Sequence, residues 1–221
     1  MSTTSRGLFI TLEGPDGSGK TTQAKLLAER LRREGFQVLE TAEPGGTRIG
    51  QQIRSILLNS ANQELRPTTE LLLMFAARAQ NVEQWILPAL EQGQIVVCDR
   101  FTDSSIAYQG AGRGLGTETV LAVDRIACRG LEPDLTVCVD IETETGLERA
   151  HARNRSNTEK SESRLDEQSV EFHRKARAAY HELARREPQR FHLVDGDGTP
   201  ETVAERVWQI VAPVVFARPI Q

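Results

Sequence analysis

The segment that most constrains the fold is 14–21, GPDGSGKT, which fills every fixed position of the phosphate-binding loop G-x-x-x-x-G-K-[ST]. A short apolar, β-rich run (7–13) precedes it, and an amphipathic stretch typical of a helix (22–34) follows it. Glycines let backbone N–H groups turn towards an anion, and the helix directs the positive end of its dipole at the same point. The pattern therefore predicts a nucleoside triphosphate site rather than a glycine-rich turn that merely joins a strand to a helix.

Side chains of this loop have separable expected roles. Lys20 is expected to reach the β- and γ-phosphates, and the hydroxyl of Thr21 is expected to hold Mg²⁺. The residues predicted to bind the triphosphate are Gly14, Pro15, Asp16, Gly17, Ser18, Gly19, Lys20, Thr21 and Thr22.

Strand and helix patterns alternate along the rest of the chain. They predict an α/β fold, with three layers (α/β/α) around a five-stranded parallel sheet, as a single domain over 1–221. The final helix has Thr199 or Asp197 as its candidate N-cap, and the long tract 68–92 is expected to bend near Pro88. Beyond the first strand, strands are predicted at 37–41, 94–99, 135–141 and 191–194, and helices at 49–58, 68–92, 117–128, 144–153, 167–186 and 200–210.

Composition indicates an ordinary soluble protein, with 38% hydrophobic and 26% charged residues. The formal charge of −4 gives no electrostatic reason to expect nucleic acid or an anionic membrane as a partner. No apolar run approaches a bilayer span, and the first residues, MSTTSRG, lack a signal-peptide core. Cys98, Cys128 and Cys138 form no C-x-x-C pair, so we expect reduced core thiols and a cytoplasmic location.

Polar residues follow the predicted strands where such sheets collect their chemistry. EPGGT (43–47) follows the second strand, and Asp99-Arg100 ends the third. A carboxylate that closes an apolar strand is typical of the Mg²⁺ shell in phosphate-loop enzymes, and Arg100 suits a second anion. The alternative is an ordinary pair of polar residues at a strand end.

The polar segment 151–164, HARNRSNTEKSESR, lies between predicted helices and carries three arginines. Phosphoryl transfer places charge on the equatorial oxygens, which mobile arginines in a lid stabilise. A solvated loop fits the composition equally well, and periodicity does not choose between the two. The phosphate loop contains no arginine, which favours a lid.

Several longer motifs extend the argument: EGPDGSGKTT, EPGGT, LLLMFAARAQ, VVCDRFTDSSIAYQGAGRG, PDLTVCVDI and SRLDEQ. In their order and spacing, from about Leu8 to Trp208, they resemble bacterial thymidylate kinases. The resemblance implies a P-loop kinase fold with a mobile lid at about 151–166. It also implies transfer of the ATP γ-phosphoryl group to dTMP with Mg²⁺, giving dTDP for deoxythymidine triphosphate synthesis, by a homodimer.

The resemblance assigns roles in the acceptor site residue by residue. Arg100 and Arg54 match residues that hold the dTMP phosphate, aided by Glu43. Asp16 resembles the carboxylate that binds the sugar 3′-hydroxyl and helps to organise Mg²⁺, and Tyr108 matches an aromatic that crowds out a 2′-hydroxyl. The remaining matches to the acceptor site are Arg78, Ser105 and Gln109, which read the thymine edge, and Ser104.

The donor side is assigned in the same way. Arg149 is matched to adenine contact, Arg153 and Arg164 to the lid arginines, and Asp166 to a position near the metal or the lid hinge. The predicted catalytic set is Lys20, Asp16, Arg100, Arg153 and Arg164, and the predicted metal set is Thr21, Asp16, Asp99 and Asp166.

One departure from the family concerns base stacking. The family usually places Phe four residues before the base-reading arginine, where this chain has Met74, and Phe75 is displaced by one. The stacking group is therefore either the thioether of Met74 or the shifted ring of Phe75, and plain core packing is the alternative for both.

Three other functions share some of these residues. A kinase for another nucleotide keeps the loop and the lid but gives no reason for Arg78, Ser105, Tyr108 and Gln109 together. A GTPase needs an N-K-x-D tetrapeptide, which the chain lacks, so the D-x-x-G match at 195–198 is better interpreted as a turn near the adenine. A non-catalytic nucleotide-binding module is the alternative from a different class.

Overall fold

The computed structural model of the chain describes residues 6–156 and 163–217. Its strands form one five-stranded sheet in the order β2-β3-β1-β4-β5, and every neighbouring pair is parallel. The predicted sheet and α/β class are confirmed. The strands are β1 (Phe9–Glu13), β2 (Val38–Ala42), β3 (Ile95–Asp99), β4 (Leu135–Asp140) and β5 (Phe191–Asp195).

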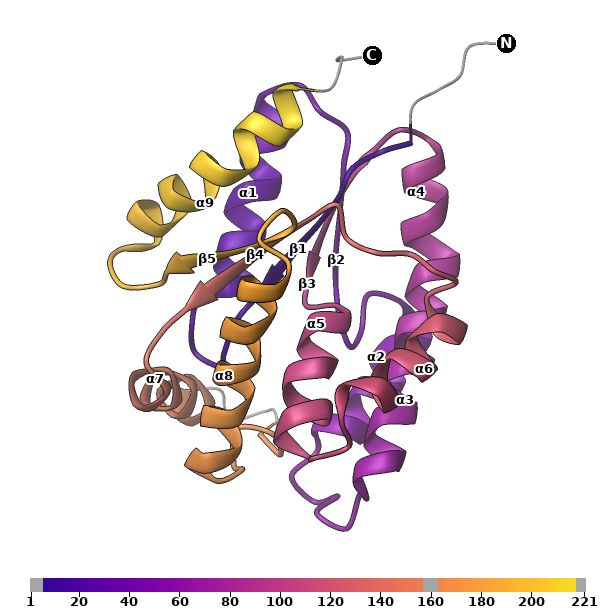
Figure 1. Cartoon of the computed structure of the whole chain (residues 1–221), viewed down its shortest axis with the longest axis vertical. Coiled ribbons are helices and arrows are strands. Elements are labelled where there is room, and N and C mark those ends of the chain that lie inside the picture. The colour runs from indigo at the N-terminus through magenta and orange to yellow at the C-terminus, as the bar shows by residue number, and fades with distance from the viewer. Residues whose placement is uncertain (1–5, 157–162, 218–221) are drawn as a thin grey trace.

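Helices cover both faces of this sheet, with α1 packed beside α9 on one side and the larger helical group on the other (Figure 1). The helices that precede β3 in the chain are α1 (Lys20–Arg33), α2 (Arg48–Leu58), α3 (Pro67–Asn81), η1 (Val82–Ile86) and α4 (Leu87–Glu91). The helices that follow β3 are α5 (Thr102–Ser105), η2 (Ile106–Gly112), α6 (Thr117–Ala127), α7 (Thr143–Ser156), α8 (Val170–Arg186) and α9 (Pro200–Phe216).

The alternation of side chains along β1 explains the three layers. Leu8, Ile10 and Leu12 enter a buried cluster with α1 and α9, whereas Phe9 enters the cluster formed with α3, α6 and α8. Successive side chains of a strand point to opposite faces, so a strand buried at every position, as β1 is, must be covered on both sides. The central strand thereby fixes the phosphate loop at its carboxyl end, between the two helical layers.

Two helical regions differ from the prediction. The tract predicted at 68–92 is divided into α3, a π-helical turn η1 and α4, and the π turn comes just before Pro88. Proline has no N–H and its ring collides with the preceding turn, so a widened turn at this place relieves the clash. Helix 102–112 (α5 and η2) was missed, because Gly110 and Gly112 lower its intrinsic helix propensity and burial in the fold supplies its stability.

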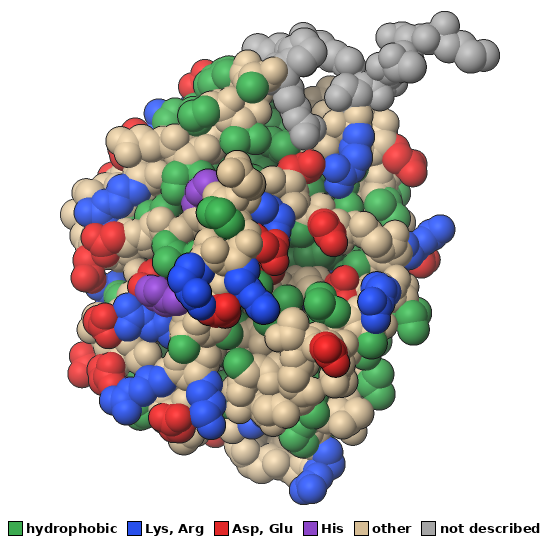
Figure 2. All heavy atoms as spheres, viewed as in Figure 1, with side chains coloured by type: hydrophobic (Ala, Val, Ile, Leu, Met, Phe, Trp, Pro, Cys, Tyr) green, Lys and Arg blue, Asp and Glu red, His purple; other side chains and the backbone are tan. Residues whose placement is uncertain are grey.

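The N-cap of α9 is Thr199, one of the two candidates, whose hydroxyl accepts from the N–H of Thr202. On the face drawn in Figure 2, positive and negative side chains are interspersed rather than gathered into one large patch of a single sign. Within the residues that the structure describes, no helix has the length and apolar character needed to cross a membrane.

Candidate active site

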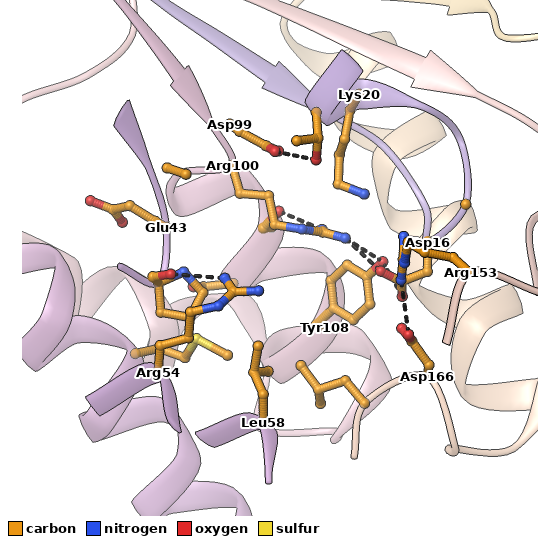
Figure 3. A pocket seen from close by; sticks show the side chains of 18 of the residues that line it. Asp16, Lys20, Glu43, Arg54, Leu58, Asp99, Arg100, Tyr108, Arg153 and Asp166 are labelled. Atoms are coloured by element: carbon orange, nitrogen blue, oxygen red, sulfur yellow. Dashed lines mark hydrogen bonds and ion pairs between the residues drawn. The ribbon is translucent and has the colours of Figure 1, made fainter. Parts of the chain in front are cut away.

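A cavity of about 470 Å³ opens at the carboxyl ends of β1, β2 and β3. Its size is that of a small-molecule site. It extends from the phosphate loop, past Arg100, to the side chains of α3 and η2 (Figure 3). Many predicted site residues line it: Asp16, Gly17, Gly19, Lys20, Thr21, Thr22, Glu43, Arg54, Met74, Arg78, Asp99, Arg100, Ser104, Ser105, Tyr108, Gln109, Arg153 and Asp166.

The phosphate loop is held closely against α7. Gly17 has φ +73°, and a Cβ there would overlap the carbonyl oxygen of Gly146. Only glycine combines this left-handed backbone with so close an approach. Helix α1 begins at Lys20, so the N-terminus of α1 faces the cavity, where an anion is favoured.

Lys20 lines the cavity with most of its side chain buried, and its ammonium group donates to the carbonyl oxygen of Pro15 at 3.1 Å. Burial, together with the nearby positive charge of Arg100, lowers the pKa of Lys20 to about 8. A polyanion that enters the cavity would stabilise the charged form of Lys20, since a nearby opposite charge favours the ammonium group.

Thr21 and Asp99 meet at the top of the site, where the Thr21 hydroxyl donates to Oδ2 of Asp99 at 2.5 Å. The other carboxylate oxygen, Oδ1, is buried without a hydrogen-bond partner. Among residues 6–156 and 163–217, no three His, Cys, Asp or Glu side chains gather into a metal-binding cluster. The predicted metal ligands Asp16 and Asp166 are instead engaged by other side chains, described below.

Arg100 lies at the centre of the site and has the left-handed φ of +71°, which is strained for a residue with a side chain. Its guanidinium donates to Asp16 at 2.7 Å, to Ser104 at 2.9 Å and to the Tyr108 hydroxyl at 3.3 Å. The guanidinium also stands 4.8 Å from the centre of the Tyr108 ring. The turn and its neighbours therefore hold Arg100 inside the cavity, opposite Lys20 (Figure 3).

Asp16 is the anionic partner of this group. Tyr108 donates to it at 2.8 Å, and Nδ1 of His173 lies 3.5 Å from the same carboxylate oxygen. Burial alone would raise the pKa of Asp16, but Arg100, His173 and Lys20 lower it well below its usual range. Asp16 therefore remains ionised, as an acceptor for donors in the cavity.

Glu13, the residue before the phosphate loop, was not predicted as a site residue. It is fully buried and accepts from the N–H of Phe101 at 2.7 Å and from the hydroxyls of Ser104 and Tyr180. Burial and the charge of Asp103 raise the pKa of Glu13 to about 7. Because it holds the peptide after Arg100, Glu13 supports the strained turn. The sequence signal available was an acidic residue at the end of an otherwise apolar strand.

Arg78 forms the far wall with Glu43, to which its Nε donates, and with Ser105, whose hydroxyl accepts from Nη2 at 3.1 Å. Both Arg78 and Glu43 are almost completely buried. Asn81 also donates to Glu43, at 3.1 Å. Glu43 lines the cavity as expected, and its carboxylate also positions Arg78.

Met74 and Phe75 take different places on α3. Met74 lines the cavity, whereas Phe75 belongs to the core and its ring lies 4.5 Å from the Arg78 guanidinium. Phe75 therefore lies outside the cavity and supports Arg78 from the core side, which favours Met74 of the two stacking candidates. Arg54 lines the cavity from α2 and donates to the carbonyl oxygen of Pro44 at 2.9 Å.

Arg164, predicted as a lid arginine of the catalytic set, is buried and lies away from the cavity. Its Nε donates to the carbonyl oxygen of Leu57 at 2.5 Å, and its Nη2 forms an ion pair with Glu70 at 2.8 Å. Arg164 therefore fastens the end of the predicted lid segment to α2 and α3. A buried guanidinium needs such an anionic partner.

Arg153 does line the cavity, from α7, and pairs with Asp166 at 3.0 Å. Asn154 donates to the same carboxylate at 2.9 Å. Part of the predicted lid, residues 157–162, lies outside the described residues. Arg149 does not line the cavity. Its Nη2 lies 3.6 Å from Oδ1 of Asp197 in the turn after β5, so the two places expected near adenine are adjacent.

A phosphate-binding loop at the carboxyl edge of a five-stranded parallel sheet, facing a second cluster of basic side chains, defines a P-loop kinase fold. The sequence model of the family described as "Thymidylate kinase" matches residues 12–207. The chain belongs to the thymidylate kinase family.

Individual relatives agree with this family. The chain is 52% identical to thymidylate kinase from Pelobacter propionicus over 91% of its own length and 92% of the relative's. It is 51% identical to thymidylate kinase from Thermomicrobium roseum, over 94% of its own length and 95% of the relative's. The crystal structure of thymidylate kinase from Ehrlichia chaffeensis is similar with a TM-score of 0.75 and 31% identity, over 94% of this chain and 99% of that one.

Proposed function

We propose that this protein transfers the γ-phosphoryl group of ATP to dTMP, giving dTDP and ADP, in the synthesis of deoxythymidine triphosphate. One observation carries the proposal: a single cavity joins Lys20 of the phosphate loop to Arg100, and Arg100 to the donors Arg78 and Ser105. Such a cavity suits two nucleotides whose phosphates meet near Arg100.

The residues act by positioning and by stabilising charge. Arg100 and Arg54 would hold the acceptor phosphate, since guanidinium groups match phosphate oxygens in pairs. Lys20 would neutralise charge on the transferring group, for which the protein supplies no covalent intermediate. Arg78 would donate to O4 of thymine, and ionised Asp16 would accept from the sugar 3′-hydroxyl.

The donor set at Thr21 and Asp99 fits a magnesium ion. Asp99 has a buried carboxylate oxygen without a hydrogen-bond partner, beside a hydroxyl group, and Mg²⁺ is typically held by one or two protein oxygens together with phosphates. Thr21 would hold the ion directly, with Asp99 beside it. When bound, the ion would neutralise charge on the donor phosphates.

A coupled ADP-release assay with Mg-ATP tests the proposal against dTMP, dUMP, UMP, CMP, AMP and GMP. We expect turnover to be fastest with dTMP. Preference for another monophosphate would retain a kinase and remove the thymine assignment. ATP binding without turnover on any acceptor would favour a binding module.

Tyr108 should set the preference for a deoxyribose. We expect Tyr108→Phe to retain the preference for dTMP over UMP, because the ring remains, and Tyr108→Ala to raise relative use of UMP at least about tenfold. The ratio of kcat/KM values for the two acceptors is the measurement, with thermal melting to check folding. An unchanged ratio in the alanine variant would remove Tyr108 from the selectivity.

We expect the affinity for ATP to depend on pH through the ammonium group of Lys20. Its pKa of about 8 in the free enzyme should rise when the triphosphate stabilises the ammonium form. Above about pH 8, ATP binding must then take up a proton, and affinity should fall by up to about tenfold per pH unit. Titration calorimetry in two buffers of different ionisation enthalpy measures the uptake, with none expected near pH 6. Absence of uptake at about pH 8.5 would contradict the prediction.

A mobile lid at about 151–166 is part of the proposal, and its support is Arg153, which lines the cavity from the end of α7. Arg164 would anchor the far end of this lid. Cytoplasmic location is supported by the three cysteines, all of them buried thiols.

A homodimer is also proposed. It is supported by large apolar side chains exposed on α2, α3 and α6, helices that pack against one another. Sedimentation equilibrium would distinguish a dimer from a monomer. The exposed apolar residues are Ile49, Ile56, Leu72, Leu121 and Ile126.

A further inference from the structure

Glu70 on α3 is a fully buried acid that was not predicted as a site residue. Its carboxylate accepts from Nε2 of Gln109 at 2.9 Å and from Nη2 of Arg113 at 2.9 Å, and it pairs with Arg164 at 2.8 Å. Every polar group around it is a donor, and two of the three are cations. The carboxylate is therefore ionised in place: burial alone would raise its pKa, but Arg113 and Gln109 lower it.

An ionised carboxylate only accepts hydrogen bonds, so it imposes a direction on the amide of Gln109. The amide has an NH₂ end that donates and an oxygen end that accepts, and only the NH₂ end satisfies Glu70. Gln109 is nearly completely buried and lines the cavity beside Arg78 and Ser105. With its nitrogen held by Glu70, the oxygen is the end of the amide that remains to contact a ligand in that cavity.

We propose that Glu70 is a positioning residue for base selectivity, which fixes the Gln109 amide with its oxygen towards the acceptor base. The inference rests on the proposed function. Thymine and uracil carry a hydrogen at N3, which donates to an amide oxygen, whereas cytosine has an unprotonated acceptor at N3. The fixed amide therefore favours a base with N3–H and places two acceptors face to face when cytosine enters.

This arrangement parallels the other wall of the site, with one difference. Glu43 orients Arg78, but a guanidinium is a donor in every orientation. The Gln109 amide changes from acceptor to donor when it rotates by half a turn. Discrimination at N3 thus depends on the Glu70 carboxylate, which lies behind Gln109 and does not itself touch the base.

The test compares kcat/KM for dTMP and dCMP in the wild type and in Glu70→Gln. Glutamine keeps the size of Glu70 but has both a donor and an acceptor end, so the Gln109 amide is released to turn. We expect the dTMP-to-dCMP ratio to fall at least about tenfold, the value of one hydrogen bond made or opposed. Glu70→Asp keeps an acceptor-only group and should retain the ratio within about threefold.

A double-mutant cycle separates orientation from general disturbance. In a Gln109→Ala background the amide is gone, so adding Glu70→Gln should change the ratio by less than about twofold. Gln168→Ala is the matched control, because Gln168 accepts from Arg113 at 2.6 Å in the same cluster without lining the cavity. It should leave the ratio unchanged.

The outcomes are distinguishable. A merely structural Glu70 would lower stability and turnover with both acceptors and leave their ratio as in the wild type, which would overturn the inference. The inference would also be overturned if Glu70→Gln lowered the dTMP-to-dCMP ratio equally in the presence and absence of the Gln109 amide. It would be overturned as well if Glu70→Asp lowered that ratio as much as Glu70→Gln does. A wild type without preference for dTMP would overturn the proposed function itself. If Glu70→Gln unfolds, Glu70→Gln/Arg113→Gln, which removes one stranded cation, is measured instead.

Discussion

Replacing Arg100 by alanine is expected to lower kcat/KM for dTMP on the order of a thousandfold, while ATP affinity stays within about threefold. A thousandfold corresponds to about 4 kcal/mol of transition-state stabilisation. The guanidinium is oriented by Asp16, Ser104 and Tyr108 towards the centre of the cavity, where the acceptor phosphate would lie. Its removal eliminates paired charge-assisted bonds to that phosphate and leaves Asp16 without its main partner.

Arg129 supplies a matched control for this variant. It is the other described arginine with a positive φ, at +56°, but it is exposed and lies outside the cavity. Arg129→Ala introduces the same change at a similar backbone conformation and should leave both constants unaltered. Steady-state kinetics with dTMP and calorimetric titration with ATP give the two quantities. Equal losses in dTMP use and ATP binding would contradict the acceptor-phosphate role.

Replacing Arg153 by alanine is expected to lower kcat about a hundredfold, with KM for dTMP within about threefold. In the structure its guanidinium pairs with Asp166 at the edge of the cavity (Figure 3). From there a lid movement would carry it to the transferring phosphoryl group, where charge develops in the transition state. An interaction made only in that state changes kcat and kcat/KM together.

Arg155 is the control on the same helix, since it is exposed and does not line the cavity. Arg155→Ala should retain full turnover, measured in the same assay at saturating dTMP. If Arg153→Ala keeps its kcat, the stabilising charge must come from another residue.

The sequence was sufficient for features that depend on local pattern. The phosphate loop, the apolar strands and the acidic-basic pair at 99–100 are contiguous, and a parallel sheet gathers strand ends at one edge whatever the connecting loops do. The same pattern could not reveal where long side chains turn. Arg153 and Arg164 are both arginines of the polar segment, yet one lines the cavity and the other is buried against Glu70.

The buried carboxylates behind the site were missed for a related reason. Glu70 lies in the first turn of a helix, where an acidic residue is ordinary in sequence. Glu13 does carry a signal, as an acid at the end of a buried strand, but the signal does not say which group it would contact. Only tertiary packing brings Glu13 behind Arg100 and Glu70 behind Gln109. Helix 102–112 was missed likewise, because contacts with α6 and α8 rather than its own propensity stabilise it.

The most direct test of the whole account is a competition in one vessel. The enzyme receives limiting Mg-ATP with equimolar dTMP, UMP and dCMP, and the diphosphates formed are separated by ion-pair chromatography. Product ratios then report the ratios of kcat/KM values. We expect dTDP to be the dominant product, as the proposed function requires. Comparable yields of UDP or dCDP would contradict it.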